Sequence, residues 1–395
     1  MLSASTDERT MEKKQTTKKQ HYISQGLLRL FSNDGKHIYE CMIPQLKVYR
    51  ARISDAMEEN YTYEHPLLED NTLESAFAAI ENSFVPQIRT IVDDVLSSKK
   101  STDEIYEKLS PLLEIFLLFY YRSGAVLSEF CYGIDNMEAK KRLRIGRLCE
   151  IITTRSYLKK LANSIRVGYK FSLLYSCKGQ FVISDQYIAT VALAYKNQFA
   201  NTSNRAIGMR DTMILLPLSN SLYVALFNGT VPQYIKQNQI CNLTESEVFQ
   251  INKIIFHNSF KKCAGPSLDT LDSLYQEKYF SYGTTQVFFG DDNSGVGGYT
   301  NKKEIFLYHE DEEICTYHIQ YALKYRELRE EHGKAHLRNI ECPCGSGIKF
   351  KACCLHKYFR AFQALEETQK PILQNYHITG CISEMPIYEF WHSKG

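Results

Sequence analysis

Apolar residues recur at helical spacing through most of residues 70–168, which predicts a helix-rich first half of the chain. Leu73, Phe77, Ile80 and Phe84 lie three or four positions apart and indicate one buried helix face. The run from Leu112 to Tyr121 is almost wholly apolar, but it is shorter than the roughly 20 residues that a membrane helix needs. We therefore expect a buried core helix there and no membrane span.

Three helix starts have the sequence of a capping box, in which a short polar residue is followed three positions later by glutamate. The three pairs are Asn71 with Glu74, Ser101 with Glu104, and Thr244 with Glu247. The third start leads into another apolar stripe formed by Val248, Ile251 and Ile255.

The pattern changes after residue 170 to short runs of β-forming residues, which predict strands. The expected strands are 171–175, 180–184, 212–216 and 222–227, with further strands at 285–289 and 304–308. Residues 196–211 are expected to form a loop, and residues 291–298 a flexible turn. The segment 291–298 lacks a calcium-loop or phosphate-loop pattern, so we do not expect it to bind a ligand. The order of elements predicts an α+β fold: a helix-rich body around a central, mainly antiparallel sheet.

The two ends of the chain differ from this body. Residues 1–20 are polar and lysine-rich, without the apolar stretch of a secretion signal, so we expect a disordered tail. Residues 311–335 are charged and predict a solvated connecting helix, and a short helix is expected over 354–369, before Pro371. The expected divisions are the tail at 1–20, the body at 21–300, a strand and connecting helix at 301–340, and a small C-terminal module at 341–395.

Composition sets limits on function. The net charge of +2 over 395 residues gives no general attraction to nucleic acid, so any such site must be a local patch. Eight of the 12 cysteines are scattered without regular spacing, and we interpret them as reduced packing residues of a cytoplasmic protein. They stand at positions 41, 131, 149, 177, 241, 263, 315 and 381. No serine-hydrolase elbow, zinc-protease helix or phosphate loop is present, which argues against those enzyme classes.

The other four cysteines form the most specific pattern of the chain. Cys342 and Cys344 are one residue apart, and Cys353 and Cys354 follow after eight residues. Glycines after the first pair allow the tight turn that aims both sulfurs at one point, and four thiolates satisfy tetrahedral zinc. We expect a structural rather than a catalytic zinc site, because four thiolates leave no position open for water.

This stretch closely resembles the SEC-C zinc motif, found at the tail of the bacterial preprotein-translocase ATPase and in many other bacterial proteins. The match covers Cys-Pro-Cys-Gly-Ser-Gly at 342–347, Lys-Phe-Lys at 349–351 and the pair Cys353–Cys354. In some relatives histidine replaces the last cysteine, so His356 is an alternative to Cys354 as the fourth ligand. The resemblance implies a docking module.

The body resembles an uncharacterised, mainly bacterial domain family with an N-terminal His-Tyr-Val-Pro motif. His21 and Tyr22 match it, followed by Leu28 and Phe31, whereas Ile23 and Ser24 stand at the last two motif positions. Later landmarks are Glu74 and Glu81, Ser184-Asp185, Pro217-Leu218-Ser219 and Asn252, in the family's order. Tyr187 replaces a further proline of the family pattern.

These landmarks supply a candidate site of His21, Glu81, Asp185 and Asn252. Two carboxylates could hold Mg²⁺ or Mn²⁺, with His21 as ligand or general base, which suits phosphodiester hydrolysis. The alternative is a polar network that only fixes helices to the sheet.

Two hypotheses of function follow. The first is a bacterial effector of a defence or toxin system acting as a metal-dependent nuclease; the alternative is a non-enzymatic sensor or adaptor. Both use a basic, aromatic edge of the zinc module, which would bind nucleic acid or an acidic protein partner. Its residues are Lys349, Phe350, Lys351, Lys357 and Arg360. The second interpretation of this edge is that its side chains only pack and solvate the module.

Overall fold

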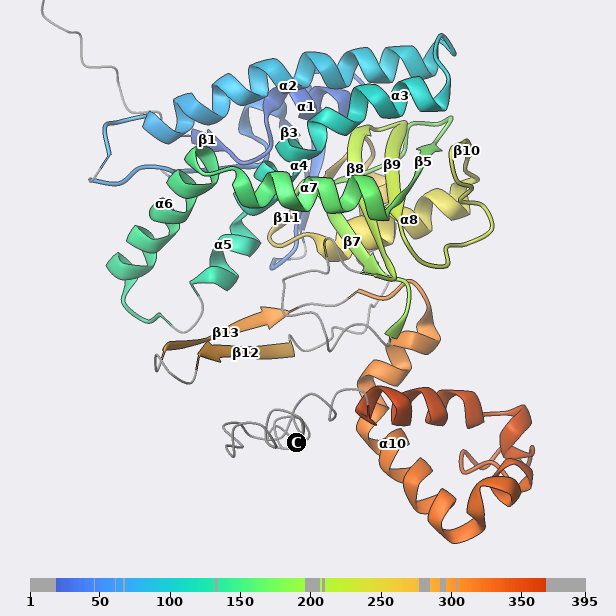
Figure 1. Ribbon diagram of the computed structural model, residues 1–395. Helices are drawn as coiled ribbons and strands as arrows, with labels where there is room; N and C mark the ends of the chain where they lie inside the picture. The colour runs from blue at the N-terminus through green and yellow to red at the C-terminus, as the bar shows by residue number, and fades with distance from the viewer. Residues whose placement is uncertain are drawn as a thin grey trace, which may run out of the picture.

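The computed structural model describes residues 19–366, apart from residues 46, 61, 67, 132–133, 196–206, 208–209, 277–284, 292–295 and 303–304. Within this part of the chain, helices cover two main sheets and a separate cysteine-containing module lies beyond them (Figure 1). The α+β class and the mainly antiparallel pairing that the sequence predicted are confirmed.

The larger sheet lies at the centre of the body. Its strand order is β10 (Ile240–Asn242), β5 (Lys170–Tyr175), β9 (Leu222–Phe227), β8 (Thr212–Ser219) and β7 (Ala189–Ala192). Only the β10–β5 pair of this sheet is parallel. Every residue of β8 and β9 is buried, so other elements cover both faces of these two strands.

A second sheet carries the N-terminal strands. Its order is β3 (Lys47–Arg52), β2 (His37–Met42), β11 (Lys262–Gly265) and β6 (Ile183–Ser184). Two separate ribbons pair β1 (Lys19–His21) with β4 (Glu58–Asn60), and β12 (Thr285–Asp291) with β13 (Val296–Lys302).

Helices pack around these sheets, and the long α2 lies along one side of the body (Figure 1). They are α1 (Gln25–Leu28), α2 (Thr72–Leu96), α3 (Thr102–Leu109), α4 (Leu113–Tyr121), α5 (Gly124–Phe130), α6 (Met137–Thr153), α7 (Ser156–Gly168), α8 (Glu245–Asn258), α9 (Leu268–Gln276) and α10 (His309–His336). A last helix covers 355–366. The apolar run is the buried helix α4, as predicted, and no helix in the described ranges is both long and apolar enough to cross a bilayer.

Two of the three predicted capping boxes are confirmed. Ser101 and Thr244 accept the backbone N–H of Glu104 and Glu247, and each glutamate accepts the N–H of its cap residue in return. The prediction for Asn71 was wrong: this residue is left-handed, with φ 63°, and its side chain makes no capping hydrogen bond. A left-handed residue directs its side chain away from the first turn, so the sequence pattern alone did not define the cap.

Several boundaries differ from the sequence predictions. Of the predicted strand 180–184 only Ile183–Ser184 is a strand, and the one at 304–308 reduces to a single bridge between Ala192 and Phe306. The predicted turn at 291–298 overlaps the paired strands β12 and β13, whose register fixes both sides of it. Lys19 and Gln20 belong to β1 instead of the tail.

Some predictions fall partly or wholly outside the described residues: the tail at 1–18, most of the loop at 196–211, and the helix beyond residue 366. Cysteine packing was predicted correctly for Cys41, Cys131, Cys241 and Cys263, which are buried, but Cys177 is exposed.

The helix α10 is more than a solvated connection. Its apolar residues Ala322, Tyr325 and Leu328 are buried in a second hydrophobic cluster together with Phe350 and Phe362 of the C-terminal segment. Tyr321 stacks on Tyr358 with ring centroids 4.6 Å apart. A core shared between α10 and the 355–366 helix therefore supports the cysteine segment.

Candidate functional site

The cysteine segment is a tight hairpin. The Cys342 N–H donates to the Ile348 carbonyl at 2.8 Å, and the Gly345 N–H donates to the Cys342 carbonyl at 3.0 Å. Gly345 and Gly347 have φ values of 77° and 70°, which side-chain-bearing residues rarely adopt. A Cβ at either glycine would meet nothing within 4 Å, so the backbone conformation, and not lack of space, requires glycine there.

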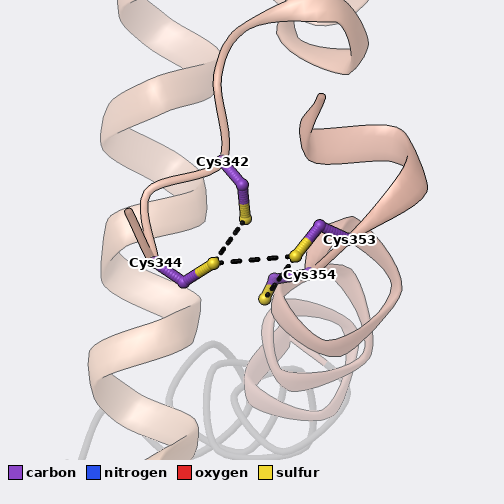
Figure 2. Close-up of side chains that lie close together, drawn as sticks. All are labelled: Cys342, Cys344, Cys353 and Cys354. Carbon is purple, nitrogen blue, oxygen red and sulfur yellow. Dashed lines mark hydrogen bonds between the residues drawn. The ribbon is translucent and has the colours of Figure 1, made fainter. Parts of the chain in front are cut away.

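The four sulfurs converge on one point (Figure 2). Cys344 Sγ lies 3.3 Å from Cys342 Sγ and 3.6 Å from Cys353 Sγ, and Cys353 Sγ lies 3.6 Å from Cys354 Sγ. All four ligand atoms are within 4.8 Å of one another. Tetrahedral zinc with bonds of about 2.3 Å needs sulfurs about 3.8 Å apart, and a disulfide needs about 2.05 Å. The geometry fits a metal ion and excludes disulfides among these four residues.

The electrostatics of the cluster also favour a cation. Hydrogen bonds from Ser346 and Cys342 lower the pKa of Cys344 to about 6, whereas burial raises the pKa of Cys342 and of Cys354. A divalent ion at the centre would favour the thiolate form of all four. The four cysteines can therefore bind a metal ion, and their donor set matches zinc best.

Cys354, and not His356, completes the cluster. His356 is exposed and places its Nδ1 3.2 Å from a carboxylate oxygen of Glu310 on α10. The Sγ atom of Cys354 already occupies the fourth position of the cluster.

The predicted basic edge is largely used within the module. Phe350 is fully buried and cannot act as a contact residue, because its ring packs edge-on against Tyr358 in the module core. Lys357 pairs with Glu313 at 2.7 Å, and Arg360 pairs with Asp311. Lys349 and Lys351 remain exposed beside Ile348, whose relative exposure is 50%.

In the body, His21 and Glu81 lie on different elements. His21 ends β1, and burial lowers its pKa, so the imidazole is neutral at pH 7. Its Nε2 is buried and has no hydrogen-bond partner among the described residues. Glu81, on α2, forms an ion pair with the buried guanidinium of Arg122.

Asp185 holds a loop by its backbone. Its Oδ1 accepts the N–H of Phe260 at 2.8 Å, and its Oδ2 accepts the N–H groups of Lys261 at 2.7 Å and Lys262 at 3.0 Å. Three donors on one carboxylate fix the approach to β11.

Asn252 performs a similar task on α8. Its side-chain oxygen accepts the Val182 N–H at 3.1 Å, and its amide donates to the Gln180 carbonyl at 2.9 Å. The amide replaces the sheet partner that residues 180–182 lack, and so joins α8 to this extended segment.

The structure gives these four residues no common metal-binding group. Among the described residues, the cysteine cluster is the one group of three or more candidate ligands close enough to hold a metal ion. Asp185 and Asn252 are bound to the backbone and Glu81 to an arginine, as in the structural alternative that we weighed for them.

Arg122 is the residue that sequence reasoning missed. Its side chain is 1% exposed, and its Nη2 donates to the Tyr22 carbonyl at 3.0 Å, to the Tyr187 hydroxyl at 3.2 Å and to Glu81. Its guanidinium carbon lies 4.6 Å from the ring centres of both Phe77 and Phe119. The signal in the sequence was an arginine directly after the apolar run of α4.

Two family models match separate parts of the chain. A family model described as "Protein of unknown function (DUF4238)" matches residues 19–265, more than half of the chain. A model of the SEC-C motif matches residues 338–355, which include all four clustered cysteines. No curated protein and no solved structure matches the chain.

Proposed function

The chain belongs to DUF4238, a family of proteins of unknown function, and we propose that it is a non-enzymatic docking protein whose SEC-C zinc knuckle contacts a partner protein. The proposal divides the chain into a scaffold body and a C-terminal zinc module. The observation that carries it is the exposed tip of the knuckle, where Ile348 stands between the closed metal cluster and two free lysines, Lys349 and Lys351.

This tip suits an acidic protein surface with an apolar centre. An exposed apolar residue flanked by cations is the composition of a small protein contact with charge complementarity. Nucleic-acid binding is less well supported, because Lys357 and Arg360 are paired with Glu313 and Asp311, which leaves two lysines. Two phosphate contacts are few beside the roughly 6–10 made by many DNA-binding proteins.

The nuclease hypothesis finds less support in the body. A two-carboxylate metal site requires free carboxylate oxygens, but Asp185 accepts three backbone N–H groups and Glu81 pairs with Arg122. We therefore favour the scaffold role, and with it a reducing, cytoplasmic location, which is supported by ten described cysteines that are all free.

The docking surface can be tested by photo-cross-linking. A photoreactive amino acid at position 348 should give one discrete adduct in the native host, and metal chelation should abolish it. The double variant Lys349→Glu/Lys351→Glu should lose the adduct. Lys159→Glu/Lys160→Glu, which makes the same charge change at two exposed positions of α7, should keep it. An adduct that survives the knuckle variant refutes this surface.

The absence of catalysis is tested separately. The purified protein is incubated with DNA and RNA in the presence of Mg²⁺ or Mn²⁺, and no cleavage is expected. Cleavage by the wild type that is lost in folded His21→Ala protein would overturn the non-enzymatic proposal and restore the nuclease hypothesis.

A further inference from the structure

A cleft in the body leads to the buried Arg122. It encloses about 440 Å³ including its open mouth, and the start of α5, α6, the 59–63 segment and the loop before β11 surround it. Its lining residues are Tyr22, Glu59, Thr62, Tyr63, Arg122, Gly124, Ser128, Arg144, Asp185, Phe260 and Lys261.

Buried polar atoms without partners gather at this cleft. Nη2 of Arg122 forms the three hydrogen bonds described above, whereas Nε and Nη1 are buried and have no hydrogen-bond partner among the described residues. The hydroxyl groups of Tyr22 and Tyr63 are in the same state. More than nine in ten buried polar groups in proteins are hydrogen-bonded, so four such atoms on three residues of one cleft need an explanation.

All four atoms are hydrogen-bond donors. Burial lowers the pKa of Arg122, but the neighbouring Tyr63 and Glu81 raise it more, and the guanidinium stays a cation. Burial raises the pKa of Tyr63 to about 12 and that of Tyr22 further, so both phenols keep their protons. Nε and Nη1 of Arg122 can only donate, so the partner that they lack is an acceptor, and each phenol can also donate to such a group.

The remaining charges of the cleft also select an anion. Of its two carboxylates, Asp185 accepts three backbone N–H groups, and Glu59 pairs with Lys261. Arg144 adds a partly exposed guanidinium that forms no ion pair with any described residue. The anions of the lining are thus occupied, while Nε and Nη1 of Arg122 and the guanidinium of Arg144 are available to an anion.

We propose that this cleft binds a small molecule through an oxyanion group, a phosphate or a carboxylate, which Arg122, Tyr22 and Tyr63 hold at the inner end and Arg144 at the mouth. The exposed ring of Phe260 offers the organic part of the ligand an apolar wall. Guanidinium groups are the usual partners of carboxylate and phosphate oxygens in proteins.

The test is calorimetric titration of the zinc-loaded full-length protein with phosphate and, separately, with acetate, at constant ionic strength. Saturable binding of either ion supports the site, and the tighter of the two identifies the oxyanion. Tyr63→Phe and Arg144→Gln should each weaken binding by at least about tenfold, since hydrogen bonds to charged groups are the stronger ones.

Two further measurements separate a ligand site from a structural cluster. Without ligand, Tyr63→Phe should not lower the midpoint of unfolding, because the lost hydroxyl has no partner. Tyr223→Phe is the matched control: its hydroxyl donates to the Val182 carbonyl at 2.7 Å, away from the cleft, so the variant should be less stable and bind equally well. Failure of both ions to bind, or unchanged affinity in Tyr63→Phe and Arg144→Gln, overturns the proposal without touching the docking role of the knuckle.

Discussion

Glu74 on α2 should make the stability of the body depend on pH in an unusual direction. Burial, and after it the charge of Glu81, raises the pKa of Glu74 from 4.5 to about 7. In the unfolded chain the carboxyl has its ordinary pKa, so between about pH 4.5 and 7 the native state binds more protons than the unfolded state. Proton binding by Glu74 therefore favours the native state. This stabilisation is fully present below the unfolded pKa and is lost as pH rises through the folded pKa.

The size of the effect follows from the difference in pKa. A rise from 4.5 to about 7 corresponds to about 3 kcal/mol, and partial exposure of Glu74 reduces the expected value to about 1–3 kcal/mol. The substitution Glu74→Gln keeps the size of the side chain and removes the charge. At pH 8 the substitution should raise the free energy of unfolding by about 1–3 kcal/mol. At pH 4.5 the free energy of unfolding should change little.

The assay is urea denaturation of wild type and variant at half-unit steps from pH 4.5 to 8. Glu107→Gln, on the exposed side of α3, is the control for removing a glutamate charge at a solvated position. The reasoning is refuted if the gain for Glu74→Gln is the same at both ends of the range, or if the variant is less stable at pH 8.

The remaining predictions concern the cysteine knuckle and the backbone hydrogen bonds of Asp185. Metal analysis should find about one zinc per chain, and Cys342→Ser/Cys344→Ser should lose it; a variant that keeps full zinc would contradict the ligand set. Gly347→Ala should lower the zinc affinity, measured by competition titration, by about fivefold or more, because a φ of 70° costs a side-chain-bearing residue about 1–2 kcal/mol. Asp185→Asn should lower the free energy of unfolding by about 2–4 kcal/mol, since an amide cannot accept all three N–H groups, and a neutral result in urea would show that the clamp is unimportant.

Sequence patterns predicted those elements that are determined by a few neighbouring residues. The strand 222–227 and the caps at Ser101 and Thr244 are found as expected, because a run of β-forming residues and a capping box are both recognised from neighbouring residues. The four clustered cysteines belong to the same class, since a thirteen-residue stretch holds all of them.

Features made by distant residues were not predictable in this way. No local pattern indicates the role of Arg122, because its partners Glu81 and Tyr187 are 41 and 65 positions away. Asp185 accepts N–H groups that lie 75 to 77 positions further along the chain. The sequence indicated a candidate metal ligand at this position, and the backbone hydrogen bonds became visible only in the fold. Burial of α10 likewise depends on Phe350 and Phe362, which follow it in the chain.

Asp311 connects the two parts of the protein and bears on how the knuckle could work. This buried carboxylate, at the start of α10, accepts the backbone N–H of Tyr195 at 3.3 Å and pairs with Arg360 of the last helix. Beside it, the Ala192 N–H donates to the Ile305 carbonyl at 2.7 Å, and the Leu307 N–H donates to the Ala192 carbonyl at 3.0 Å, at the outer edge of the large sheet. The segment that leads into α10 is thus paired with the edge strand β7, and Asp311 contacts both the body and the last helix. If a partner binds at Ile348, the ion pair of Asp311 with Arg360 helps to hold the last helix against α10.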